Sequence, residues 1–167
     1  MSRLGPFPEN DAASSAKRVR VLVVDDSALM RKLLKDLLTS SGLIEVVGVA
    51  RDGREAVVQA AKLKPDVITL DVAMPEVSGL DALPAILAVR EVPVVMVSAL
   101  TQEGADVTLR ALELGAVDFH PKPTRHQFSE MRAEAELLVN KVLGAAQSRV
   151  VRRRRTAAPP IAPASRP

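Results

Sequence analysis

The stretch RVRVLVVDD (18–26), followed directly by SALMRKLLKDLLTSSG (27–42), contains two different hydrophobic patterns. The first segment is a short apolar run, rich in valine, that ends abruptly in two aspartates. In the second segment, leucine and methionine recur at the spacing of a helix with one buried face. Ser27 is suited to cap the start of this helix, and Gly42 is suited to end it. The stretch therefore predicts a buried strand followed by an amphipathic helix.

The same strand–helix pair recurs four more times along the chain. The further predicted strands are IEVVGVA (44–50), DVITLD (66–71), PVVMVS (93–98) and VDF (117–119). The further predicted helices cover about 53–63, the segment after the loop MPEVSG to about 90, 102–114 and about 126–146. Pro84 is expected to delay or kink the start of the third helix. Strands that are apolar throughout need cover on both faces, so the sequence predicts an α/β fold, a doubly wound five-stranded parallel sheet with five helices.

Charge is distributed unevenly along the chain. The whole sequence has a net charge of +3 and a pI of about 9.6, a value that raises the possibility of nucleic-acid binding. However, residues 149–167 contain six arginines and no acidic residue, whereas residues 19–148 carry 14 basic and 18 acidic residues. The folded part is therefore acidic, which argues against nucleic acid as its partner. The four arginines at 152–155 are expected to form a solvated, extended segment.

Composition predicts a disordered head at 1–17, one folded domain at 18–146 and a basic, Pro/Ala-rich linker or tail at 147–167. The chain has no cysteine, which excludes disulfides and cysteine nucleophiles. Its two histidines, His120 and His126, are too few for an ordinary zinc centre, and we expect both at the surface. No apolar run approaches the roughly 20 residues of a membrane-spanning helix, and no secretion signal is evident. We therefore expect a cytoplasmic protein without a membrane partner.

Polar residues stand at the ends of several predicted strands. The first predicted strand leads into Asp25 and Asp26, and the third leads into Asp71. The fourth leads into Ser98 and the fifth into Lys122. Ligands of open α/β sheets bind beyond the carboxyl ends of the strands, so these side chains are expected to converge on one rim. Three carboxylates placed together need a cation, and Mg²⁺ prefers oxygen ligands. With an ammonium group opposite, such a rim is suited to receive a phosphoryl group on a carboxylate.

Each of these residues also has a simple structural explanation when it is considered alone. An aspartate such as Asp25 or Asp26 is favoured near a helix N-terminus, and Asp71 before Met-Pro is a common turn residue. Ser98 is suited to a cap or turn, and most lysines, Lys122 included, are solvated. The convergence of complementary groups from four strand ends favours the functional interpretation.

Four segments together resemble the receiver domain of two-component response regulators, over about residues 18–145. They are VLVVDDSALMRKLL (21–34), ITLDVAMPEVSGLD (68–81), VVMVSA (94–99) and the pair Lys122-Pro123. More narrowly, PVVMVSALTQEGADVTLRALELGAVDF (93–119) resembles the receiver half of chemotaxis protein-glutamate methylesterases. The resemblance implies the flavodoxin-like receiver fold.

The resemblance also implies roles for individual residues. Asp71 matches the residue that accepts a phosphoryl group from the phosphohistidine of a chemotaxis-type histidine kinase. The implied ligands of Mg²⁺ or Mn²⁺ are Asp25, Asp26, Asp71 and the backbone carbonyl of Ala73.

Three further features near the site follow from the same resemblance. Ser98 and Lys122 match the residues that contact the phosphoryl oxygens. Considered alone, Phe119 is expected to fill the core. In the resemblance it matches the aromatic residue that moves together with the hydroxyl residue during switching. The Lys122-Pro123 peptide matches one that is cis in receivers, a geometry that occurs mainly before proline.

The implied function is that of a phosphorylation-controlled receiver in a chemotaxis response regulator. No Gly-x-Ser-x-Gly motif occurs, and few residues follow position 150, so this chain is not expected to be an enzyme by itself. We expect it to control a methylesterase and glutamine deamidase output domain that is not in the chain. One alternative is a stand-alone receiver switch that docks a protein partner. Another, suggested by the arginine run, is a DNA-binding regulator.

Overall fold

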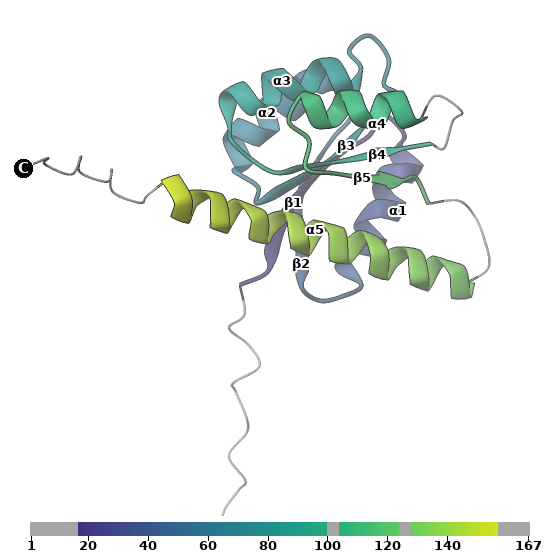
Figure 1. The fold of residues 1–167 in the computed structure, drawn as a ribbon. Coiled ribbons are helices and arrows are strands. Elements are labelled where there is room, and N and C mark those ends of the chain that lie inside the picture. The colour runs from purple at the N-terminus through teal and green to yellow at the C-terminus, as the bar shows by residue number, and fades with distance from the viewer. Residues whose placement is uncertain (1–16, 100–103, 124–127, 157–167) are drawn as a thin grey trace, which may run out of the picture.

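A parallel sheet with the strand order β2-β1-β3-β4-β5 forms the middle layer of the molecule (Figure 1). The computed structural model describes residues 17–99, 104–123 and 128–156, with the backbone alone at 128–129 and 149–156. The strands are β1 (Val19–Val24), β2 (Ile44–Ala50), β3 (Val67–Asp71), β4 (Val94–Ser98) and β5 (Asp118–Pro121). All the paired neighbours run parallel, as the strand–helix alternation predicts.

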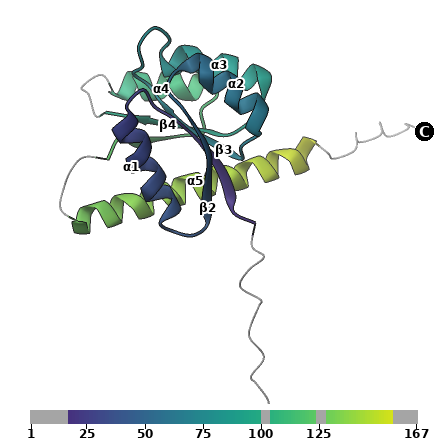
Figure 2. The same cartoon turned by 180° about the vertical axis from the view of Figure 1, so that it is seen from behind.

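Helices cover both faces of the sheet, which confirms the predicted doubly wound fold (Figures 1 and 2). They are α1 (Ala28–Thr39), α2 (Gly53–Leu63), α3 (Gly79–Val89), α4 (Gly104–Glu113) and α5 (Phe128–Thr156). Helices α1 and α5 pack on one face, and α2, α3 and α4 pack on the other. Each face therefore has its own hydrophobic cluster, because successive strand residues point to opposite sides.

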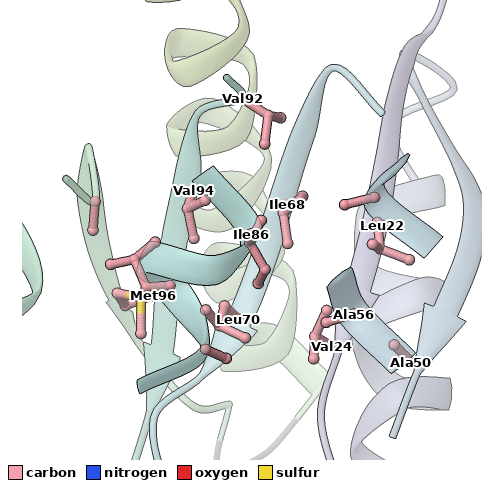
Figure 3. Packing of buried hydrophobic residues seen from close by; sticks show 14 of the residues in the cluster. Leu22, Val24, Ala50, Ala56, Ile68, Leu70, Ile86, Val92, Val94 and Met96 are labelled. Carbon is pink, nitrogen blue, oxygen red and sulfur yellow. The ribbon is translucent and has the colours of Figure 1, made fainter. Parts of the chain in front are cut away.

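The central strands β1, β3 and β4 are mostly apolar because both of their faces are largely buried, whereas the edge strand β2 is partly exposed and carries Glu45. Leu22 and Val24 of β1 belong to the cluster under α2, α3 and α4, whereas Val21 and Val23 belong to the cluster under α1 and α5. Figure 3 shows part of the first cluster, in which Ile86 of α3 packs against the sheet. This packing orders the strand ends that carry the polar residues.

Local signals mark both ends of α1, as the sequence predicts. The Oγ atom of Ser27 accepts a hydrogen bond from the backbone N–H of Met30 at 3.2 Å and caps α1. Gly42, with φ of 72°, adopts the left-handed conformation that favours glycine after a helix. Pro84 does not delay α3, which begins at Gly79 after its N-cap Ser78. Proline therefore lies inside the helix, at an exposed position.

Helix α5 is longer than the sequence predicted. It was expected to end at about residue 146, but it continues to Thr156 and includes the arginine run at 152–155. The expected extended conformation of that run is therefore wrong. Arginine is a good helix former, and cations are favoured near a helix C-terminus, where the helix dipole is negative. Among the helices in the described ranges, none is both long and apolar enough to cross a membrane.

Candidate functional site

The carboxyl ends of β1 and β3 bring three carboxylates together. In the β1–β3 register Val24 pairs with Leu70, so that Asp25 and Asp71 follow side by side. Asp25 and Asp71 are 0% and 1% exposed, whereas Asp26 is exposed. One oxygen from each of the three carboxylates lies within 4.8 Å of the other two. We refer to Asp25, Asp26, Asp71 and Lys122 as the acidic rim.

Lys122 joins the rim from the segment that follows β5. Its Nζ atom donates a hydrogen bond to Oδ2 of Asp71 at 3.0 Å and lies 3.1 Å from Oδ2 of Asp25. Its backbone N–H donates to the carbonyl of Ser98 at 2.7 Å, which ties this segment to the end of β4. Residues 46 or more positions apart in the sequence thus form one buried charge cluster with two anions, Asp25 and Asp71, and one cation, Lys122.

Burial shifts the protonation equilibria of the rim. Burial raises the pKa of Asp71 to about 6, and the nearby Asp25 carboxylate acts in the same direction. The hydrogen bond and charge of Lys122 oppose this rise, as does the N–H of Ala73, which donates to Asp71 Oδ1 at 3.2 Å. For Lys122, burial lowers the pKa, but the hydrogen bond and charges of its aspartate partners outweigh burial and raise it. At neutral pH the rim therefore holds an ionised Asp71 beside an ammonium group.

The loop that carries Asp25 and Asp26 is held by several hydrogen bonds. The N–H of Asp25 donates to the carbonyl of Ala50 at 3.0 Å, and its Oδ1 accepts from the N–H of Ser27 at 2.9 Å. Nη1 of Arg31 donates to the carbonyls of Asp25 and Asp26 at 2.8 and 3.2 Å. Arg31 was not among the site residues predicted from the sequence. The sequence feature that could have identified it is an arginine in the first turn of the helix that follows an acidic pair at a strand end.

Gly79 is a second residue of the site that was not predicted from the sequence. A Cβ atom at this position would overlap the backbone oxygen of Asp71. The N–H of Gly79 donates to the carbonyl of Val72 at 2.8 Å, so the start of α3 lies against the end of β3. Only glycine allows this close approach, which holds the backbone of Asp71 in place. A glycine at the end of the loop MPEVSG was the available signal.

Ser98 and Ala73 lie next to the rim, at the ends of β4 and β3. Ser98 is 9% exposed, and its Oγ donates a weak hydrogen bond to the carbonyl of Ala99 at 3.3 Å rather than to a carboxylate. Ala73 is exposed, two residues beyond Asp71. Their predicted contacts with a phosphoryl group and a metal ion remain predictions.

Phe119 lies apart from the rim. It is half-buried and packs against the hydrophobic cluster under α2, α3 and α4. It lines a cavity of about 540 Å³ beside α4. The other lining residues are Ala99, Gly104, Ala105, Thr108, Leu109 and Leu112. Phe119 is therefore placed between the core and a surface hollow, and its predicted switching role remains a prediction.

The Lys122-Pro123 peptide differs from the sequence-based expectation. It is trans, and the described ranges contain no cis peptide bond. The trans form is the lower-energy isomer of most X–Pro bonds, by about 0.5–1 kcal/mol. With this trans peptide, the Lys122 side chain already reaches both of its carboxylate partners.

The prediction that His120 lies at the surface is wrong, because the residue is buried. It lies on β5 with 4% of its surface exposed, and its Nδ1 atom has no hydrogen-bond partner among the residues that the structure describes. Burial lowers its pKa to about 4; the charge of Lys141 lowers it further, and Asp118 opposes the shift. His120 is thus a neutral core residue at physiological pH. His126 lies outside the described residues.

The chemistry of the rim fits a hard divalent cation. The side-chain atoms of the rim that could bind a metal ion are carboxylate oxygens of Asp25, Asp26 and Asp71, and Mg²⁺ prefers oxygen ligands. Oδ2 of Asp25 is buried yet accepts no well-formed hydrogen bond, although Lys122 lies close to it. A cation held by these oxygens would satisfy that atom and reduce the repulsion among the carboxylates.

Comparison with known proteins identifies the family of this site. Residues 21–135 match the response regulator receiver domain, and the chain belongs to this family. The receiver is similar to those of chemotaxis protein-glutamate methylesterases. The Archaeoglobus fulgidus protein-glutamate methylesterase/protein-glutamine glutaminase is 55% identical over 130 residues, which cover 78% of this chain and 37% of that protein. The Pyrococcus abyssi relative is 52% identical over 133 residues, which cover 80% of this chain and 36% of that protein.

Solved structures agree with this assignment. The response regulator domain of Thermotoga maritima CheB matches with a TM-score of 0.70 and 48% identity, covering 78% of this chain and 98% of that domain. A CheX–CheY complex with BeF3 and Mg²⁺ from Borrelia burgdorferi matches with a TM-score of 0.60 and 30% identity, covering 72% of this chain and 88% of the matched one.

The chain spans little more than a third of the length of the curated relatives named above. The receiver is the part that it shares with these relatives. This chain therefore contains a receiver domain like that of CheB-type chemotaxis response regulators.

Proposed function

We propose that Asp71 accepts a phosphoryl group from the phosphohistidine of a chemotaxis-type histidine kinase. We further propose that this step controls a methylesterase output domain, and that the exchange takes place in the cytoplasm. The observation that carries the proposal is the placement of Asp71. It is a buried carboxylate at the carboxyl edge of the sheet, bonded to Lys122 and within 4.8 Å of two other carboxylates.

Asp71 acts as the nucleophile in this proposal. With a pKa of about 6, it is largely ionised at neutral pH and is more basic than an ordinary aspartate. One of its oxygens attacks phosphorus, an O–P bond forms, and the P–N bond to the imidazole breaks. The electron pair of the broken bond goes to the imidazole nitrogen. The leaving group is a neutral histidine side chain when its ring carries one proton.

Lys122 provides the cationic group for the transferred oxygens. Its ammonium already contacts Oδ2 of Asp71, so a phosphoryl group on Asp71 would lie within its reach. Ser98 at the end of β4 would add a neutral donor if its Oγ turned away from the Ala99 carbonyl. Such a turn of Ser98, together with movement of Phe119 beside its cavity, would change the surface around α4 and β5.

The carboxylates of Asp25, Asp26 and Asp71, with the carbonyl of Ala73, would hold Mg²⁺ or Mn²⁺. When bound, the ion supplies charge neutralisation for the phosphoryl oxygens. The family resemblance and the presence of Mg²⁺ with BeF3 in the similar Borrelia burgdorferi complex support this assignment.

Labelling with radioactive acetyl phosphate in MgCl₂ tests the acceptor. The wild-type chain should form an acid-stable, hydroxylamine-sensitive acyl phosphate, and Asp71→Asn should reduce labelling to background. Asp36→Asn, an exposed aspartate on α1, is the matched control and should label like wild type. Undiminished labelling of Asp71→Asn would show that another residue is the acceptor. Transfer from a phosphorylated chemotaxis kinase to wild type, but not to Asp71→Asn, would test the predicted donor.

A further inference from the structure

Arg31 makes an unusual contact with the loop that carries two of the rim carboxylates. Its Nη1 atom donates hydrogen bonds to the backbone carbonyl of Asp25 at 2.8 Å and of Asp26 at 3.2 Å. Arg31 lies at the start of α1, where its own N–H donates to the Ser27 carbonyl at 2.9 Å. The side chain is half-buried. One guanidinium nitrogen therefore connects α1 to two successive peptide groups of the loop.

The two aspartates of this loop depend on Arg31 to different degrees. Asp25 is also held through its N–H by Ala50, through Oδ1 by Ser27 and through Oδ2 by Lys122. The carboxylate of Asp26 is exposed and has no hydrogen-bond or ion-pair partner in the described part of the chain. The direction of the Asp26 side chain thus depends on its backbone, and Arg31 is the side chain that holds the Asp26 carbonyl.

We propose that Arg31 is a positioning residue that raises the affinity of the acidic rim for a divalent cation by fixing the Asp25–Asp26 loop. This inference rests on the proposed function, because it concerns the same metal-binding carboxylates. Outer groups that orient metal ligands commonly change metal affinity without touching the ion. Arg31 would act in this way through the backbone.

Electrostatics and positioning make opposite predictions for Arg31. The guanidinium is a cation close to a site for another cation, so its charge by itself weakens divalent-ion binding. If charge were its only effect, removal of Arg31 would tighten binding. If the hydrogen bonds to the two carbonyls matter more, removal would weaken binding. The sign of the change in affinity therefore decides between the two roles.

Arg31→Met removes the charge and the donors while retaining most of the aliphatic length. We expect the Kd for Mg²⁺ to rise roughly tenfold, the lower end of the 10–100-fold range for loss of an outer-shell partner. Arg31→Lys retains the charge but loses the planar guanidinium, so an intermediate loss is expected. Lys32→Met is the matched control, because Lys32 is exposed on the same helix and has no described contact with the loop. Its Kd should stay at the wild-type value or fall slightly.

The measurement is a titration of the full 167-residue chain with MgCl₂, followed by NMR, and with MnCl₂, followed by electron paramagnetic resonance. Thermal unfolding without a divalent cation checks that each variant is folded. If Arg31→Met does not fold, Arg31→Lys decides, and wild-type affinity in that variant overturns the proposal. Unchanged or tighter binding by folded Arg31→Met also overturns it. Failure of wild type to bind either ion would instead contradict the metal site of the proposed function.

Discussion

Two buried ionisable residues occupy the same cross-strand row of the sheet but have opposite electrostatic surroundings. Asp71 on β3 pairs with Val97 on β4, and Val97 pairs with His120 on β5. Asp71 is 1% exposed and His120 is 4% exposed. Asp71 has an ammonium partner in Lys122. Nδ1 of His120 has no hydrogen-bond partner among the described residues, and the charges of Lys141 and Asp118 act on it in opposite directions.

Burial moves both residues toward their neutral forms. The pKa of Asp71 rises to about 6, and that of His120 falls to about 4. At neutral pH Asp71 nevertheless stays ionised, whereas His120 is neutral and behaves as part of the core. The comparison shows that burial alone does not make a reactive site. A charge is retained inside the protein where a partner of opposite sign lies beside it.

Lys122→Met should have the largest effect, because it removes the partner that distinguishes the two residues. Asp25 and Asp71 would be left as buried carboxylates without a cation, and loss of one member of such a cluster typically costs about 3–5 kcal/mol. We expect the free energy of unfolding to fall by about 3 kcal/mol at neutral pH, toward the lower end of that range because Lys122 is partly exposed.

The measurement for Lys122→Met is urea unfolding at pH 7.5 and pH 5. The loss should be smaller at pH 5, where Asp71 takes up a proton. The double variant with Asp71→Asn serves as the control and should be more stable than Lys122→Met alone. Equal stability of the single and double variants would contradict the proposed repulsion.

His120→Val should change the pH dependence of stability. Since the pKa of His120 is about 4 in the folded chain and near 6.5 when unfolded, the unfolded chain binds more protons between these values. Stability associated with neutral His120 is therefore present above pH 6.5 and is lost as the pH falls toward 4. The difference corresponds to at most about 3 kcal/mol.

Urea unfolding of wild type and His120→Val from pH 4 to pH 7.5 measures this contribution. The variant should lose less stability on acidification than wild type does. His126→Val, in which the other histidine is replaced, provides the matched control. Parallel pH profiles for wild type and His120→Val would contradict the assignment of a lowered pKa to His120.

Gly79→Ala tests the placement of Asp71 without a change in charge. The added Cβ would overlap the Asp71 carbonyl oxygen, so the start of α3 and the end of β3 would have to separate. We expect a loss of about 1–3 kcal/mol, as for other overpacked sites, and slower phosphorylation by acetyl phosphate. Gly104→Ala is the control, because a Cβ there meets no atom of the described residues within 4 Å. Equal stability and labelling of the two variants would show that the close approach is unimportant.

Most of the architecture was predictable because it depends on local periodicity. The switch from apolar strand runs to helical spacing located the five strand–helix pairs, and parallel topology then predicted that Asp25, Asp26, Asp71 and Lys122 would converge. The structure brings these four residues together. Their chemical roles remain predictions that the labelling and titration experiments test.

Other features required tertiary structure because they depend on contacts between distant segments. Whether His120 is buried depends on which face of β5 it occupies and on the packing around it, which a four-residue strand does not reveal. Strand neighbours alone also do not show that the Arg31 guanidinium reaches two carbonyls, or that Gly79 lies against Asp71.

The sequence by itself determined the order of strands and helices and the kinds of groups at the strand ends, because both follow from short-range periodicity and residue chemistry. Only the tertiary structure decided which ionisable groups are buried, which have partners and which protonation state each one favours. Those properties depend on solvent exclusion and on distances of a few ångströms between residues far apart in the chain. Asp71 and His120 illustrate this, because burial shifts the pKa of each toward the neutral form, and only Asp71 has the ammonium group of Lys122 beside it to oppose that shift.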